Sequence, residues 1–447
     1  MEEVKSHVAE HEQLVDESDK FTLSQATLYG MNAVIGSGIF LLPQTIYKDL
    51  GPASLLAMIV DVILVLLLAV CFAEVAGYFS KNGGAFQYSK AAFGDFVGFN
   101  VGILGWFVTI IAWSAMAAGF ARLLSMAFPA VSNYQTIVSI ILVLLLSGMN
   151  ILGIKTSKIF TITVTIAKLV PIIAFVGCSI FFFKHGFDAG NFTPFLQLNP
   201  NMSLSQAVAS TSLTIFYAFI GFETLPIVAG EMQNAKQNVP KAILGSISIV
   251  SILYFIIIAG TISMLGVGIL QSDAPVQDAF REMVGPVGAW LISIGALISI
   301  AGLNMGESIM IPRYGAAISD EGLLPAFIGQ LNSKGAPINA ILVSAVATIL
   351  LLLSGSFEDL AELSVVFRFF QYIPTALAVI SLRKKRRMDF VPEFRVPGGI
   401  IIPILATVVS LWMMIAADTK NLIYGAVGIV IASILYFVIN PKRRMKK

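Results

Sequence analysis

The sequence predicts an all-α integral membrane protein with twelve transmembrane helices. Only 12% of its 447 residues are charged and 57% are hydrophobic, whereas soluble globular proteins carry roughly twice that share of charge. Apolar runs of about 20 residues, the length that crosses a bilayer, also recur along the whole chain. A water-exposed globule of this size would need far more polar side chains to cover its surface.

Charged residues and glycine or proline breaks divide the apolar sequence into twelve predicted spans. They cover residues 24–48, 52–79, 96–127, 134–153, 158–184, 206–231, 242–270, 286–312, 338–354, 360–382, 398–416 and 421–440. Spans 9, 11 and 12 are the shortest. An acidic N-terminal tail of residues 1–20 lacks the apolar core of a cleavable signal peptide, and a basic C-terminal tail of residues 441–447 follows the last span.

The distribution of lysine and arginine predicts the orientation of the chain. If both termini lie on one side, that side carries most of these residues, including the run 383–387 and the C-terminal tail. The opposite side keeps only Lys48, Lys184, Arg281 and Lys420. Because basic residues concentrate in cytosolic loops, we expect a multi-pass plasma-membrane protein with both tails in the cytosol.

The few histidines and cysteines restrict the chemistry. His7, His11 and His185 lie in the N-terminal tail or at a helix end, and Cys71 and Cys178 lie within apolar runs. They cannot form a metal site or a disulfide framework, and no nucleophile with an oriented base lies within the membrane. We therefore expect no enzyme, no cofactor, no metal and no nucleic-acid partner. A channel is disfavoured because the polar residues form no continuous lining.

Two spans contain glycine near their middle and are predicted to be broken. Span 1 carries Gly36-Ser37-Gly38, and span 6 carries Ile-Gly-Phe-Glu-Thr at 220–224. Glycine costs a helix interior about 1 kcal/mol, and irregular backbone at membrane depth persists only where protein buries it or where it lines a wet cavity. Close packing of small residues explains one such site equally well. A matched pair in the first and sixth spans is typical of a transporter binding site.

The predicted breaks leave backbone groups without helical partners, and these groups suit a small zwitterion. The N–H groups of Ser37, Gly38 and Ile39 lie at the positive start of a half-helix, which favours a carboxylate. Freed carbonyl groups, which favour an ammonium group, are those of Ala33, Val34, Ile35, Phe219 and Ile220. A site that combines both sets of groups fits the head group of an α-amino acid.

Several motifs follow one another in the order of a known transporter family. The stretch 36–40 reads Gly-Ser-Gly-Ile-Phe and the stretch 216–223 reads Phe-Tyr-Ala-Phe-Ile-Gly-Phe-Glu. Further matches lie at 73–75, 82–86, 313–314, 320–325 and 390–398. Together these motifs resemble the amino acid–polyamine–organocation (APC) transporters over most of the chain.

This resemblance implies an architecture of two inverted repeats with five helices each, in which helices 1 and 6 are broken. Residues 21–185 would form the first repeat and residues 200–382 the second. Spans 11 and 12, within residues 398–440, would be appended helices. Transporters of this family work by alternating access, so the resemblance also implies a substrate site at the midplane between the broken helices.

The resemblance also assigns roles to individual residues. The family's carboxylate site maps to Ser37 and Gly38, with the Ile39 N–H. Its lid residue, four before the sixth-helix glycine, maps to Tyr217, although a tyrosine there also suits core packing. The carbonyls of its amine site map to Val34, Ile35, Phe219 and Ile220. The remaining pocket side chains are small or aromatic, namely those of Ala33, Phe216, Tyr217 and Phe219.

Lys168 is predicted to lie deep in the membrane. It is about ten residues into span 5, and at about 1.5 Å per residue it is too far from the helix end for its side chain to reach water. It resembles the fifth-helix lysine of sodium-independent family members, whose ammonium group replaces a sodium ion between spans 1, 5 and 8. It either takes part in coupling or is a fixed structural cation satisfied by carbonyls of the broken span 1.

Three further charged residues lie within or beside the spans. Glu223 follows the break in span 6 and is either a cap that holds the break open or a proton-linked acid. Glu307 in span 8 either reaches Lys168, binds a proton or selects a basic substrate. Arg368 is placed near Asp359 and Glu362 at the outer start of span 10, where it either joins an external gate or forms an ordinary ion pair.

The sequence therefore predicts a sodium-independent secondary transporter of a neutral L-amino acid, coupled to protons or exchanging one amino acid for another. A cationic amino acid or polyamine is the alternative substrate, and it is favoured if Glu307 faces the pocket. No covalent partner subunit is expected, because the loop at 128–135 lacks the cysteine that some family members use for one. The short tails favour a bacterial plasma membrane.

Overall fold

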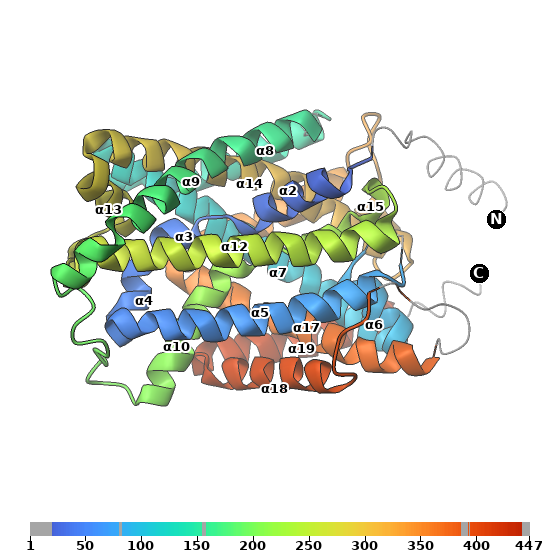
Figure 1. Cartoon of the computed structure of the whole chain (residues 1–447). Coiled ribbons are helices and arrows are strands. Elements are labelled where there is room, and N and C mark those ends of the chain that lie inside the picture. The colour runs from blue at the N-terminus through green and yellow to red at the C-terminus, as the bar shows by residue number, and fades with distance from the viewer. Residues whose placement is uncertain (1–19, 80–82, 154–157, 386–391, 393, 440–447) are drawn as a thin grey trace.

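The computed structural model describes residues 20–79, 83–153, 158–385, 392 and 394–439. Within these residues the chain forms a bundle of helices that run roughly side by side (Figure 1). Both ends of the described chain lie at one end of this bundle, which we call the termini face, and we call the opposite end the far face. The predicted tails, residues 1–20 and 441–447, lie outside the described residues except for Lys20.

Ten uninterrupted helices of the described chain are apolar enough to be membrane spans. Eight lie in stretches long enough to cross a bilayer: α5 (Ser54–Ala76), α7 (Asp95–Ala127), α8 (Gln135–Ile151), α9 (Lys158–Asp188), α12 (Ala235–Leu265), α14 (Pro286–Asp320), α17 (Phe357–Lys385) and α19 (Thr419–Ile439). Two are shorter: α16 (Ile338–Leu352) and α18 (Ile401–Ala416).

The other two predicted spans are interrupted, as expected from their glycines. The first consists of α2 (Leu23–Val34), α3 (Gly38–Leu41) and α4 (Pro43–Leu50). The second consists of α10 (Leu204–Phe219) and α11 (Thr224–Ile227). Together with the ten uninterrupted helices, they account for all twelve predicted spans.

Shorter helices lie between the spans. They are α6 (Ala85–Phe93), α13 (Pro275–Val284) and α15 (Ala326–Gly329), together with 3₁₀ turns at Gly51–Ala53, Pro129–Tyr134, Ala229–Glu231 and Gly266–Gln271. The limits of span 8 differ from the prediction, because α14 continues past residue 312 to Asp320. The apolar run stops near Arg313, but the small residues that follow it are compatible with a helix that extends beyond the apolar layer.

Both interrupted spans begin with the same local device, a capping box. Thr22 caps α2 and exchanges hydrogen bonds with Gln25, while Ser203 caps α10 and exchanges hydrogen bonds with Gln206. Each box satisfies two of the N–H groups that a helix start leaves without partners. The two interrupted spans therefore have well-defined starts, and their irregularity is confined to the middle.

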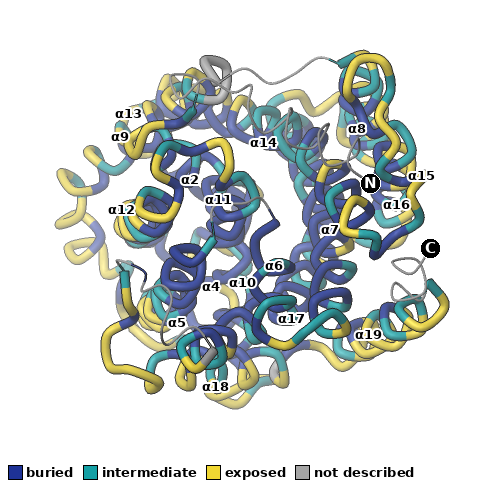
Figure 2. The backbone as a smooth tube through the Cα atoms, turned by 90° about the vertical axis from the view of Figure 1, so that its right-hand side faces the viewer, coloured by how far each residue is buried: buried dark blue, intermediate teal, exposed yellow. Residues whose placement is uncertain are grey.

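Large apolar side chains cover the outside of the bundle. Figure 2, which views the bundle along its axis, shows exposed residues on the outer surface and buried residues around the centre. Phe181 is 82% exposed and Val287 is 76% exposed, which in a soluble protein would be unusual for neighbouring apolar helices. Polar and charged side chains such as Lys168, Glu223 and Arg368 are buried in the interior instead. This arrangement is typical of a protein whose solvent is lipid.

Candidate functional site

The first break separates α2 from α3 where the glycines predict it. α2 ends at Val34, Ile35 is extended with ψ of 91°, and Ser37 directly precedes α3. Within the described chain, the N–H groups of Ser37, Gly38 and Ile39 donate to no protein oxygen. Because Leu42 also has helical dihedral angles, α3 and α4 continue as one rod whose start carries these three unpaired donors.

The second break lies directly against the first. α10 ends at Phe219, and Gly221 has a φ of 129°, which is a conformation that only glycine adopts readily. A Cβ atom on Gly221 would lie 2.3 Å from the carbonyl oxygen of Ala33, so the two interrupted backbones are in contact. The carbonyl groups of Phe219 and Ile220 receive no hydrogen bond from the described chain. Unpaired donors and unpaired acceptors therefore meet at one place.

A narrow cavity of about 30 Å³ lies at this meeting point. Its walls come from α2, α3, α7, α10, α14, α17 and the two breaks. They consist of Ala33, Val34, Gly36, Ser37, Gly38, Ala112, Met116, Tyr217, Ala218, Ile220, Gly221, Leu303, Glu307 and Arg368. A cavity of this size holds only one or two water molecules. An amino acid therefore requires the lining side chains to move apart.

The cavity includes some of the predicted pocket residues and not others. Ala33, Val34, Ser37, Gly38, Tyr217 and Ile220 line it, whereas the side chains of Ile35, Ile39, Phe216 and Phe219 do not.

The excluded residues have identifiable partners elsewhere. The Phe216 ring packs against Phe369 and Tyr372, and the Phe219 ring packs against Tyr254. In this structure the Phe216 and Phe219 rings therefore fill the helix interfaces behind the cavity and do not form the predicted aromatic lining. For Phe219, only the backbone carbonyl group is a candidate for substrate contact.

Two of the carbonyl groups predicted to bind an amine already have partners. The Ile35 carbonyl accepts hydrogen bonds from Lys168 Nζ at 2.8 Å and from Ser299 Oγ at 3.1 Å. The Val34 carbonyl accepts one from the Tyr254 hydroxyl at 3.1 Å. A carbonyl oxygen has two lone pairs, so Ile35 has no remaining capacity while Val34 keeps one.

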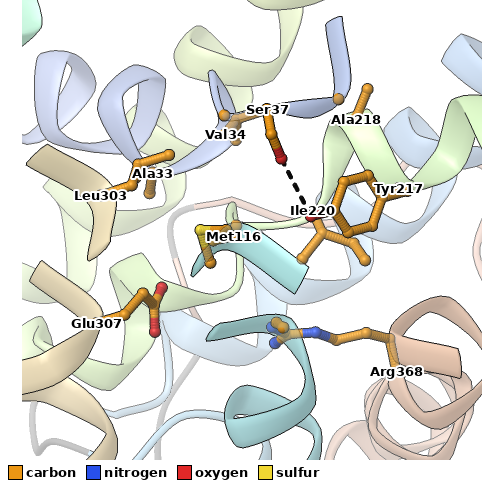
Figure 3. A pocket seen from close by; sticks show the side chains of 14 residues that line it. Ala33, Val34, Ser37, Met116, Tyr217, Ala218, Ile220, Leu303, Glu307 and Arg368 are labelled. Carbon is orange, nitrogen blue, oxygen red and sulfur yellow. Dashed lines mark hydrogen bonds between the residues drawn. The ribbon is translucent and has the colours of Figure 1, made fainter. Parts of the chain in front are cut away.

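Tyr217 closes the cavity on one side. Its hydroxyl lies 3.2 Å from Ser37 Oγ across the gap between α10 and α3 (Figure 3). Its ring packs edge-on against Phe357 in the first turn of α17, with ring centroids 5.7 Å apart. The side chain is only 7% exposed. Tyr217 therefore lies between the cavity and the far-face end of α17.

Lys168 lies where three helices meet beside the first break. It projects from α9, is fully buried, and donates to the carbonyl oxygens of Asn32 at 2.9 Å and Ile35 at 2.8 Å. Ser299 from α14 donates to the same Ile35 carbonyl. Spans 1, 5 and 8 therefore meet around the Lys168 side chain, and the broken end of α2 has a hydrogen-bond donor there.

Glu223 holds the second break through three contacts. One carboxylate oxygen forms an ion pair with Arg368 at 2.5 Å. The other accepts hydrogen bonds from the Gly221 N–H at 3.0 Å and the Tyr372 hydroxyl at 2.9 Å. Glu223 thus contacts the backbone of the break and connects it to α17.

The position of Arg368 corrects the prediction that placed it at the outer start of span 10. Its predicted neighbours have other partners: Asp359 accepts from Ser356, and Glu362 accepts from the Asp418 N–H. Arg368 is instead 3% exposed, paired with Glu223 and part of the cavity wall. It lies 11 positions after the start of α17, which is about 16 Å at 1.5 Å per residue. The depth argument used for Lys168 would also have placed Arg368 at the midplane.

Glu307 faces the cavity without a partner. It projects from α14, and Arg368 projects toward the same space from α17 on the other side (Figure 3). No hydrogen bond or ion pair from the described residues reaches the Glu307 carboxylate, and Lys168 donates to carbonyls instead. The option that Glu307 pairs with Lys168 is therefore not realised. Its neighbour Asn304 turns away and donates to carbonyls of Met116 and Ile300.

Comparison with known proteins matches this chain to a family of transporters. The family model described as amino acid permease matches residues 21–440. The methylthioribose transporter of Bacillus subtilis is 24% identical and the branched-chain amino acid permease BcaP of the same organism is 26% identical. These alignments cover 94% and 93% of this chain and 93% and 92% of the respective relatives. The serine/threonine exchanger SteT of B. subtilis is 28% identical over 86% of this chain and 87% of its own length.

Proposed function

This chain belongs to the amino acid permease family, and on that premise we propose that it is a sodium-independent secondary transporter of a neutral L-amino acid. Substrate binds between the two broken helices and reaches either side of the membrane by alternating access. Transport is coupled to protons or to the exchange of a second amino acid. Because family members are transporters, the chain is not an enzyme.

The observation that carries this proposal is the contact between the two breaks. Unpaired N–H groups at the start of α3 suit a carboxylate, and unpaired carbonyl groups at the end of α10 suit an ammonium group. Both charges of an α-amino acid are thereby satisfied by the main chain. The side chain of the substrate is then the only part left for the cavity wall to select.

Charge balance in the cavity links the substrate to the coupling ion. Arg368 is balanced by Glu223, so an ionised Glu307 leaves one uncompensated negative charge in a low-dielectric site, which is unfavourable. A zwitterionic substrate brings no net charge, and Glu307 would therefore take up a proton with it. Two relatives, SteT and BcaP, are named for neutral amino acids, which favours a neutral substrate for this chain.

A cationic amino acid or polyamine is the second candidate, because Glu307 lines the cavity. Such a substrate would itself supply the positive charge that balances this carboxylate. The two candidates then differ in one respect. With a neutral substrate the charge on Glu307 is balanced by a proton, whereas with a cationic substrate it is balanced by the substrate.

Sodium independence and orientation follow from other residues. The Lys168 side chain occupies the space between α2, α9 and α14 and donates to carbonyl oxygens there, which disfavours a bound sodium ion at the same place. The asymmetry of lysine and arginine favours a cytosolic termini face. Bacterial relatives favour a location in the cell membrane. The far face is then the external side.

The division into inverted repeats of residues 21–185 and 200–382 belongs to the same proposal. The two interrupted spans support it, since each starts with a capping box and breaks near its middle. Rocking of one repeat-derived bundle against the other would expose the breaks to each side in turn. Tyr217 would act as the lid on the far-face side.

Uptake into proteoliposomes tests the proposal. The full chain is reconstituted and given L-[³H]leucine, L-[³H]serine or L-[³H]lysine under an inward proton gradient, with internal unlabelled amino acid, or under a sodium gradient alone. We expect leucine or serine uptake driven by protons or exchange and unaffected by sodium, with protein-free liposomes as the control. Uptake of lysine alone would favour the second candidate, and uptake driven by sodium alone would contradict the role given to Lys168.

A further inference from the structure

A second cavity opens at the far face, outside the lid. It has a volume of about 350 Å³ and lies between α7, α8, α16 and the first turn of α17. It is within the size range of small-molecule sites, whereas the central cavity is too narrow for an amino acid before it opens. Its wall carries one cationic and one anionic side chain, those of Arg122 and Glu358.

These two are the charged side chains of the wall, and Thr136 adds an exposed hydroxyl group. Arg122 and Glu358 form an ion pair with each other, and they remain 21% and 43% exposed. Two neighbouring polar groups are already engaged: Gln135 donates to Ser125, and Ser139 donates to the Ala117 carbonyl. A zwitterion between the charged pair would exchange one ion pair for two, carboxylate to guanidinium and ammonium to carboxylate.

The first turn of α17 connects this cavity to the lid. Ser356 and Asp359 cap that turn by exchanging hydrogen bonds between side chain and backbone. Within it, Phe357 packs against Tyr217 on one side and lies under the Arg122 guanidinium, 6.0 Å from the ring centroid, on the other. Phe357 is therefore in contact with both the Arg122 guanidinium and the Tyr217 ring.

Glycine at position 119 permits the close approach that this connection needs. A Cβ atom there would lie 3.0 Å from the Cβ of Ser37 and 3.3 Å from the ring of Phe357. α7 therefore touches the lid support and the first break at the same point. The far-face cavity and the central site are separated by the Phe357 and Tyr217 rings.

We propose that the far-face cavity is a second binding site for a zwitterionic amino acid, held by Arg122 and Glu358. Binding there separates the ion pair, loosens Phe357 from Arg122 and prepares Tyr217 to open over the central site. The proposal rests on the proposed function, since it assumes that the transported molecule is an α-amino acid.

Binding stoichiometry tests this proposal. L-[³H]leucine is titrated onto the full chain in nanodiscs, and bound ligand is counted per chain. We expect two molecules per chain, falling to one in Arg122→Gln and in Glu358→Gln, with the affinity of the remaining site changed less than threefold. Arg281→Gln is the matched control, because Arg281 pairs with Asp278 on α13, away from the cavity wall. It is expected to retain two.

The outcomes separate the two proposals. One molecule per chain in the unmodified protein, together with intact leucine uptake, would overturn the second site and leave the proposed function standing. Two molecules in both cavity variants would also overturn it. Absence of both binding and uptake would contradict the proposed function for this substrate as well. Size-exclusion profiles identify variants that fail to fold, and Arg122→Lys, which keeps the positive charge, is expected to retain two molecules.

Discussion

At the scale of single residues, the central cavity is distinguished by an unbalanced carboxylate. Arg368 and Glu223 form a buried pair, while Glu307 shares the cavity wall with Arg368 and has no hydrogen-bond or ion-pair partner among the described residues. Ionised groups in a low-dielectric interior are stable only when they are paired. The ligand, a proton or both would therefore have to complete the charge of this site.

Glu307→Gln tests this requirement. The amide keeps the shape of the side chain but cannot exchange a proton. An inward gradient of one pH unit supplies about 1.4 kcal/mol per proton, which supports about tenfold accumulation. We expect the variant to lose this stimulation in proteoliposomes while it still exchanges internal for external neutral amino acid.

Glu362→Gln is the control for that experiment, because among the described residues Glu362 accepts only from the Asp418 backbone in the far-face loop. It is expected to keep its response to the proton gradient. If Glu307→Gln also keeps a full response, the proton is carried elsewhere. If it loses lysine uptake in a chain that transports lysine, the carboxylate selects the substrate.

The same residues show what can be predicted from sequence. Lys168 and Glu307 are recognisable as intramembrane charges because their depth follows from counting along one helix. Which partner each one meets depends on the packing of distant segments. Arg368 shows this limit, since its neighbours in sequence are Asp359 and Glu362, but its partner Glu223 lies in the break between α10 and α11.

At the scale of elements, the two interrupted helices depend on glycine at their point of contact. Gly221 combines a φ of 129° with an approach to Ala33 that leaves no space for a side chain. Strained backbone of this kind costs about 1–3 kcal/mol when the residue is not glycine. Gly221 therefore determines both the break in the second interrupted span and its contact with the first.

Gly221→Ala is expected to reduce uptake to background and to lower the thermal unfolding temperature in detergent. Gly177→Ala on α9 is the matched control, because a Cβ atom there has no other atom within 4 Å. Alanine stabilises a helix interior by about 1 kcal/mol relative to glycine, so the control should unfold at the same or a higher temperature. Full uptake by Gly221→Ala would mean that the contact is dispensable.

The limits of a helix could be predicted where the sequence contains a residue with a strong local effect on the backbone. The breaks fall where Gly36, Gly38 and Gly221 predict them, because glycine acts locally. The side chains of Phe216 and Phe219 were not predictable in the same way, since either the cavity or a helix interface satisfies an aromatic ring. The structure places both rings in interfaces.

At the scale of the whole molecule, the chain is a lipid-facing bundle with a polar centre. The centre is built from main-chain groups of α3 and α10, braced by Lys168 on one side and by Glu223 and Arg368 on the other. The far-face side is closed by Tyr217 and Phe357. We propose that these main-chain groups bind both the carboxylate and the ammonium group of an α-amino acid.

Competition by single-charge analogues of leucine tests whether both charged groups are bound. Isopentylamine lacks the carboxylate and 4-methylpentanoate lacks the amino group, while both keep the branched side chain. Hydrogen bonds to a charged group contribute about 1.5–3 kcal/mol each, so losing those to either charge should weaken binding about 100-fold or more. We predict that both analogues displace L-[³H]leucine at least 100-fold less effectively than leucine does. If either analogue displaces L-[³H]leucine within a few fold as effectively as leucine does, the two breaks do not bind both charged groups of the amino acid.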